Sequence, residues 1–172
     1  MRKIKKLFVL LALSLGLVVG AAAQTSEAYK KKLSTLYKGT VPVMQPADLD
    51  AALDQGEPII LLDTRAPREY EVSHLPGATF VDYDHFNKKA VKDLDRNARV
   101  VVYCTVGYRS ERIGEQLKKL GFTDVHNLYG GIFEWKNQGH DVVDEAGNAT
   151  EAVHTYSKQW SKWLQTGKKV YQ

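Results

Sequence analysis

Two short, uninterrupted apolar runs constrain the fold of this chain more than any other feature. Residues 59–62 read Ile-Ile-Leu-Leu, and residues 100–102 read Val-Val-Val. Runs of this length without alternating polar residues are typical of strands buried on both faces of a parallel sheet. Stretches with helical periodicity alternate with these runs, and one of them places Ile113, Leu117 and Leu120 on a single helix face. The sequence therefore predicts an α/β domain with a mostly parallel central sheet flanked by helices.

The first 23 residues have the pattern of a targeting segment. Four Lys or Arg lie within residues 1–6, an apolar run covers residues 7–19, and three alanines follow at residues 21–23. This order is typical of a secretory signal peptide, which we expect to be cleaved after residue 23. Because the apolar run is short for a membrane span, an uncleaved N-terminal anchor is the less favoured alternative. We therefore expect an exported protein, periplasmic or secreted, with no stable membrane association after cleavage.

The charge balance argues against a strongly basic domain. The chain has 24 Lys and Arg and 20 Asp and Glu, and four of the basic residues lie in the predicted signal peptide. The other 20 basic residues balance the 20 acidic ones, so the pI of about 9.0 reflects the signal peptide. A concentrated basic surface is the feature that would favour nucleic-acid binding. We expect no nucleic-acid partner.

Three segments follow the predicted signal peptide. Residues 24–40 are predicted to be an N-terminal helical extension, residues 41–145 the α/β domain, and residues 146–172 a loop and a Trp-rich helix. Four residues would share one face of that last helix: Tyr156, Trp160, Trp163 and Leu164. Such a stripe is more often core than ligand site, so we expect it to pack beside the N-terminal helix. A surface for a partner protein is the alternative.

The single cysteine of the chain, Cys104, follows the second apolar run closely. A lone cysteine cannot form an internal disulfide, so it is either an inert buried side chain or a reactive thiol. In open α/β sheets reactive groups gather where strands end, and the loop after Cys104 leads into a helix that begins near Ser110. Loop amides and a helix N-terminus stabilise a thiolate, Gly107 allows a tight turn, and Arg109 adds a cation. This arrangement favours a nucleophilic thiolate acting on a small anionic substrate.

Three motifs resemble those of single-domain rhodanese-like sulfurtransferases. They are LLDTRAPREYEVSHLPGA from residue 61, VVYCTVGYRS from residue 101 and NLYGGIFEWKNQGHDV from residue 127. The resemblance implies a rhodanese-like fold and the transfer of sulfane sulfur from a small anionic donor such as thiosulfate to cyanide or a thiol. Cys104 would carry the sulfur as a persulfide, and Arg109 would bind the anionic oxygens of the donor. The rest of the substrate-binding loop would be Thr105, Val106, Gly107, Tyr108 and Ser110. No metal or organic cofactor is implied.

Loop length separates this chemistry from that of related phosphatases. Four residues lie between Cys104 and Arg109, whereas the rhodanese-fold phosphatases that the site resembles have five, because phosphate needs a wider cradle. A phosphatase or an arsenate reductase is therefore a minor alternative. The main alternative is a sulfur carrier, or a module that binds a protein redox partner, with little turnover of its own.

Charged residues after the first apolar run have two interpretations each. Asp63 and Arg65 could orient the rim of the pocket, but a salt bridge that holds the loop is favoured. Arg68 could assist anion capture at the pocket entrance, although a solvated surface arginine is favoured. His74 is expected to be a hydrogen-bonded turn residue. None of the five histidines has metal-ligand spacing beside the single cysteine, so no metal site is predicted.

Overall fold

The computed structural model describes residues 27–171, and the chain divides after Thr35 into two compact units. In the first unit, residues 27–34 form a helix. The second unit starts at Leu36 and contains the sheet and the site described below. The predicted signal peptide, residues 1–23, lies outside the described residues. Within residues 27–171, no helix has both the length and the apolar character needed to cross a bilayer.

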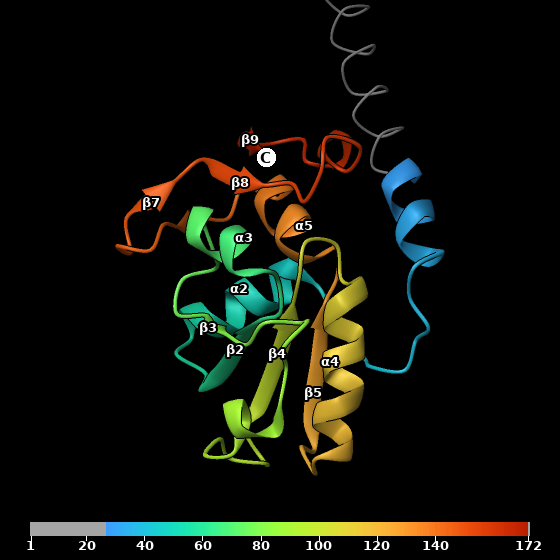
Figure 1. Ribbon diagram of the computed structural model, residues 1–172, viewed down its shortest axis with the longest axis vertical. Coiled ribbons are helices and arrows are strands. Elements are labelled where there is room, and N and C mark those ends of the chain that lie inside the picture. The colour runs from blue at the N-terminus through green and yellow to red at the C-terminus, as the bar shows by residue number, and fades with distance from the viewer. Residues whose placement is uncertain (1–26, 172) are drawn as a thin grey trace, which may run out of the picture. The chain divides into compact units, whose positions relative to one another are not determined.

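A five-stranded parallel sheet forms the centre of the second unit (Figure 1). Its strand order is β1-β5-β4-β2-β3. The strand bounds are β1 Val43–Met44, β2 Ile59–Asp63, β3 Thr79–Phe80, β4 Arg99–Tyr103 and β5 Asp124–Leu128. The two apolar runs are neighbours in register, since Ile60 pairs with Val100 and Leu62 with Val102. The predicted α/β class and its mostly parallel sheet are therefore confirmed.

Helices connect the strands and cover the sheet. Their bounds are α2 Pro46–Asp54, α3 Pro67–Val72, α4 Tyr108–Lys119 and α5 Gly131–Asn137, with a short 3-10 helix, η1, at Lys88–Val91. Helix α4 lies along β4 and β5 (Figure 1). Its predicted apolar face is buried, because Ile113 and Leu117 are inaccessible to solvent and pack in one core with Val100 and Val125. Full burial of each such side chain contributes roughly 1.5–3 kcal/mol, which fixes α4 and the loop that enters it.

The C-terminal segment differs from the sequence prediction. It forms an antiparallel pair, β6 Val142–Val143 with β7 Ala149–Thr150, and a parallel pair, β8 Ala152–His154 with β9 Lys168–Val170. Between β8 and β9 only a single 3-10 turn, η2 at Ser161–Trp163, is helical.

The predicted Trp-rich helix is thus reduced to one turn, and two backbone features explain the correction. The N–H of Thr155 donates to the carbonyl of Val170 at 2.7 Å, which extends the pairing of β8 and β9 and draws this stretch out of a helix. Tyr156 has a φ of +63°, a left-handed conformation that interrupts a right-handed helix. The predicted stripe is not one buried face either, because Leu164 is buried whereas Tyr156 is 51% exposed.

Candidate active site

Cys104 follows β4 directly, at the carboxyl edge of the sheet where the chain turns into α4. Its Sγ accepts a hydrogen bond from the backbone N–H of Gly107, with an N···S distance of 3.2 Å. Gly107 has a φ of +96°, a conformation that favours glycine and lets the loop curl around the sulfur. Helix α4 begins at the next residue, Tyr108, so the sulfur faces the positive end of a helix dipole. These features equip the position for a thiolate.

Tyr37 holds the peptide that joins Val106 to Gly107. Its hydroxyl donates to the Val106 carbonyl at 2.7 Å and accepts from the Gly130 N–H at 2.9 Å. The Tyr37 ring lies so close to Gly107 that a Cβ there would overlap it. Because the carbonyl and the N–H of a planar trans peptide point in opposite directions, fixing the Val106 carbonyl aims the Gly107 N–H at Cys104. Burial raises the pKa of Tyr37 well above its ordinary value, so the hydroxyl stays protonated and available as a donor.

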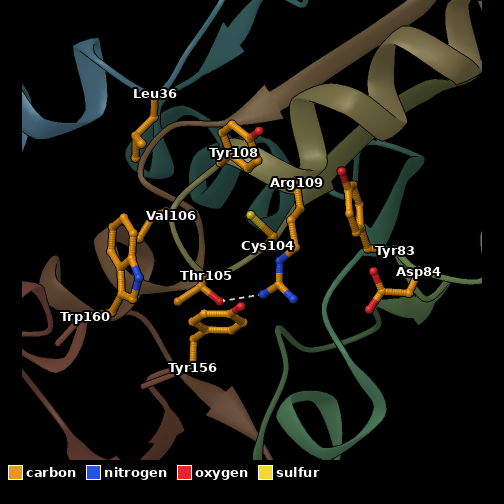
Figure 2. A pocket seen from close by; sticks show the side chains of 10 residues that line it. All are labelled: Leu36, Tyr83, Asp84, Cys104, Thr105, Val106, Tyr108, Arg109, Tyr156 and Trp160. Carbon is orange, nitrogen blue, oxygen red and sulfur yellow. Dashed lines mark hydrogen bonds between the residues drawn. The ribbon is translucent and has the colours of Figure 1, made fainter. Parts of the chain in front are cut away.

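Arg109 is held by Glu69, a residue of α3 that the sequence does not predict as part of the site. Its two terminal nitrogens each lie 2.8 Å from a Glu69 carboxylate oxygen. One of them also donates to Thr105 Oγ1 at 2.9 Å (Figure 2), and the Thr105 hydroxyl donates to Glu69 Oε1 at 2.8 Å. The three side chains form a closed network, so the guanidinium has one fixed orientation.

The charge of Glu69 is stabilised by this network. Burial acts to raise the pKa of Glu69, but the hydrogen bonds and charge of Arg109, the charge of Arg65 and the N–H of Ala66 lower it to about 2. Burial likewise acts to lower the pKa of Arg109, and Glu69 and Cys104 more than compensate, so this pKa is raised. The pair is therefore ionised at neutral pH, with the guanidinium beside Cys104.

Ser110 and Asn127 hold the loop through side-chain hydrogen bonds. Ser110 Oγ donates to Asn127 Oδ1 at 2.7 Å, and Asn127 Nδ2 donates to the Gly107 carbonyl at 3.0 Å. Both side chains are buried. Ser110 therefore holds the loop through Asn127, a residue of β5, and does not line the pocket that Cys104 faces.

The start of α5 packs against the backbone of the same loop. The N–H of Ile132 donates to the Cys104 carbonyl at 2.9 Å, and that of Phe133 to the Thr105 carbonyl at 3.3 Å. Gly131 has a φ of +57°, and a Cβ at this position would collide with the Cys104 carbonyl. Glycine is thus required here both by the backbone conformation and by the close approach of two segments.

A cavity of about 490 Å³ opens onto the thiol (Figure 2). Its lining includes five of the predicted loop residues, which are Cys104, Thr105, Val106, Tyr108 and Arg109. Five more lining residues come from elsewhere in the chain, and these are Leu36, Tyr83, Asp84, Tyr156 and Trp160. Tyr108 is 44% exposed, as expected for a side chain at the mouth of the pocket.

The three residues predicted to support the site do not line this cavity. Asp63 and Arg65 are fully buried and form an ion pair, with 2.7 Å between Arg65 Nη2 and Asp63 Oδ2. Arg65 Nη2 also donates to the carbonyl of Ser73, so the pair ties the end of β2 to the segment after α3. Asp63 and Arg65 thus form a salt bridge that holds the loop, which is the interpretation that the sequence analysis favours. Arg68 is exposed.

One of the unpredicted site residues, Glu69, carries a weak signal in the sequence. Glu69 is the third residue of a helix that begins at Pro67, a position where a carboxylate often caps the helix, and it accepts from the Ala66 N–H at 3.0 Å. Asn127 carries no such signal, because Asp124 and His126 of the same strand are also polar. Tyr37 has no such signal, because in the sequence it belongs to the apolar face of the predicted N-terminal helix.

The rhodanese-like domain family matches residues 45–138, which is more than half of the chain. This chain belongs to the rhodanese-like domain family. The predicted family and fold are thereby confirmed. Four contributors to the site lie outside the matched region, and these are Leu36, Tyr37, Tyr156 and Trp160.

Individual relatives support the same assignment. The probable adenylyltransferase/sulfurtransferase MoeZ of Mycobacterium tuberculosis is 34% identical over 94 residues, which cover 54% of this chain and 24% of MoeZ. The putative sulfur carrier protein YrkF of Bacillus subtilis is 30% identical over 96 residues, covering 56% of this chain and 51% of YrkF. The crystal structure of the BH2092 protein of Bacillus halodurans aligns with a TM-score of 0.57 and 26% identity, over 71% of this chain and 88% of that one. The chain thus spans about a quarter to about half of these two curated relatives.

Within residues 27–171, no three His, Cys, Asp or Glu side chains are grouped so that they could hold a metal ion.

Rhodanese-like relatives of this chain include proteins named as a sulfurtransferase and as a sulfur carrier, so the domain belongs to a group with sulfur chemistry.

Proposed function

We propose that this protein is a sulfurtransferase in which Cys104 carries sulfane sulfur as a persulfide. The observation that carries the proposal is the hydrogen bond from the Gly107 N–H to Cys104 Sγ, 3.2 Å long, at the N-terminus of α4. Thiolates at such positions are stabilised and serve as nucleophiles. The names of MoeZ, a probable adenylyltransferase/sulfurtransferase, and YrkF, a putative sulfur carrier protein, support the same chemistry.

The proposed reaction consists of two displacements at sulfur. In the first, the Cys104 thiolate attacks the outer sulfur of a donor such as thiosulfate, the S–S bond of the donor breaks, and sulfite leaves with the electron pair. In the second, cyanide or a thiolate attacks the outer sulfur of the persulfide, and the Cys104 thiolate leaves. Each displacement exchanges one bond to sulfur for another, so no external oxidant or reductant is consumed.

Named groups around Cys104 have distinct roles in this proposal. In the proposed persulfide, the backbone N–H groups of the loop, that of Gly107 among them, stabilise the negative charge of the outer sulfur. Arg109, fixed by Glu69 and adjacent to the sulfur, supplies a positive charge during both displacements. The loop has four residues between Cys104 and Arg109, which favours sulfur transfer over phosphate transfer.

A sulfur carrier is the second candidate, and the name of one relative favours it. YrkF, which is 30% identical to this chain over 96 residues, is named as a putative sulfur carrier protein.

A thiosulfate:cyanide assay separates the two candidates. We expect thiocyanate to form over many turnovers with the purified protein and not with the Cys104→Ser variant. Formation of a persulfide without thiocyanate turnover would favour the carrier. If folded protein yields neither product, the proposed function is wrong.

We also propose that the protein is exported, on the strength of the signal-peptide pattern in residues 1–23. Expression of the full chain in a bacterium, followed by fractionation and N-terminal sequencing, tests this. The expected product is found outside the cytoplasm and begins at Gln24. Full-length protein retained in the cytoplasm would contradict the proposal.

A further inference from the structure

Two aromatic side chains that line the cavity beside Cys104 come from outside the family region. Tyr156 and Trp160 lie beyond residue 138, where the family match ends, in the segment between β8 and η2 (Figure 2). Tyr156 is held there in a left-handed conformation, φ +63°, and its N–H donates to His154 Nδ1 at 3.1 Å. A bulky side chain rarely adopts this conformation, so the surrounding segment imposes the position of Tyr156.

The one cation among the described residues that line the cavity is already paired. Of the described residues that line it, only Arg109 and Asp84 are charged. Arg109 is bound at 2.8 Å by the buried Glu69, and the ring of Tyr156 covers its guanidinium at 5.2 Å. A doubly charged inorganic donor therefore meets no unpaired cation among these residues, and the thiolate and Asp84 both repel it. A singly charged donor suffers less repulsion.

Half of the uncharged lining residues are aromatic. Figure 2 shows Tyr83, Tyr108, Tyr156 and Trp160 surrounding Cys104 and Arg109. The volume of about 490 Å³ is far larger than thiosulfate needs and falls in the range of roughly 300–1,000 Å³ that is typical of pockets for organic ligands. Aromatic rings bind flat apolar groups by stacking and edge contacts.

We propose that the sulfur donor is an organic monoanion, a thiosulfonate or a persulfide, whose flat apolar group packs against Trp160 and Tyr156. This inference rests on the proposed sulfurtransferase function and specifies its substrate class. The Cys104 thiolate attacks the terminal sulfur, the bond from that sulfur to the rest of the donor breaks, and a sulfinate or thiolate leaves with the electron pair. The C-terminal segment, which the family match does not include, thereby determines the choice of donor.

Three donors separate the effects of charge and of the aromatic group: benzenethiosulfonate, methanethiosulfonate and thiosulfate. The readout is the single-turnover rate of persulfide formation, measured by mass spectrometry on the purified protein. We expect benzenethiosulfonate to react about tenfold faster than methanethiosulfonate, as one aromatic contact site can provide, and thiosulfate to react most slowly. In the Trp160→Ala variant the ratio between the two thiosulfonates should fall toward one. A ratio is used because any general loss of folded protein cancels in it.

The Trp163→Ala variant is the matched control, because Trp163 lies in the same segment and is not part of the cavity lining. It should keep the thiosulfonate ratio of the unmodified protein. The donor proposal is overturned if thiosulfate reacts as fast as benzenethiosulfonate, or if Trp160→Ala leaves the ratio unchanged. Persulfide formation from thiosulfate alone would overturn the donor class while upholding the proposed function, whereas no persulfide from any donor would overturn both.

Discussion

The Tyr37 hydroxyl donates a 2.7 Å hydrogen bond to the Val106 carbonyl, on the peptide whose other end presents an N–H to Cys104. Tyr37 precedes the region that matches the rhodanese-like family, so this hydrogen bond to the Cys104 loop comes from outside that region. The Tyr37 hydrogen bond fixes the direction of the Gly107 N–H. If the peptide between Val106 and Gly107 rotated, Cys104 Sγ would lose this hydrogen-bond donor. Tyr37 is thus a positioning residue for Cys104.

Replacing Tyr37 with Phe keeps the ring against Gly107 and removes the hydroxyl. We expect alkylation of Cys104 by iodoacetamide at pH 7 to slow roughly fivefold, the equivalent of about one net hydrogen bond. Alkylation rates and thermal unfolding curves would be measured together. The exposed Tyr171→Phe substitution is the control. An unchanged alkylation rate in a folded Tyr37→Phe variant would show that the Tyr37 hydroxyl does not act on the thiol.

Removing the charge of Glu69 should destabilise the protein in a pH-dependent way. Glu69→Gln leaves the Arg109 guanidinium without its carboxylate, and we expect a loss of roughly 3 kcal/mol in the free energy of unfolding at pH 7. The folded-state pKa of Glu69 is lowered to about 2 from an ordinary 4.5, so its contribution is complete above about pH 4.5 and is lost as the pH falls toward 2.

Urea unfolding at several pH values checks this prediction. The gap between the unmodified protein and Glu69→Gln should be constant from pH 7 to about 5 and should close between about 4.5 and 2. Glu71→Gln changes an exposed carboxylate on the same helix and should cost little at any pH. A gap that widens on acidification would contradict the assigned direction of the pKa shift.

Gly131→Ala should destabilise the loop that follows Cys104, because Gly131 packs against the backbone of that loop. The added Cβ meets the Cys104 carbonyl, and φ at this position is +57°, so strain and overpacking together should cost roughly 2 to 5 kcal/mol. Gly147→Ala is a matched control, since Gly147 also has a positive φ, +80°, but has open space around it. Its cost should be about 1–2 kcal/mol, with sulfur transfer retained. Chemical denaturation and the persulfide assay measure both effects, and equal costs for the two variants would refute the close-approach argument.

The parts of this protein that are predictable from its sequence are those fixed by local pattern. The apolar runs at residues 59–62 and 100–102 are neighbouring strands, and the periodicity of Ile113 and Leu117 locates α4. The place of Cys104 follows from these, because a strand followed by a helix requires a loop at the carboxyl edge of the sheet.

Features that depend on contacts between residues far apart in the sequence could not be predicted from the sequence. Glu69 is 40 residues from Arg109 along the chain, and nothing near either residue indicates that they pair. The C-terminal segment has helical periodicity in its aromatic residues, yet strand pairing between β8 and β9 and the left-handed Tyr156 override it. Its two pocket aromatics, Tyr156 and Trp160, therefore reach the site from a loop.

The most direct test of the sulfur-carrying role of Cys104 is the intact mass of the protein after reaction with a sulfane-sulfur donor, measured beside the Cys104→Ser variant. One added sulfur atom on the unmodified protein, released by a thiol reductant and absent from Cys104→Ser, is the predicted result. Sulfur uptake that persists in Cys104→Ser, or no uptake from any donor by folded protein whose Cys104 is readily alkylated, would contradict it.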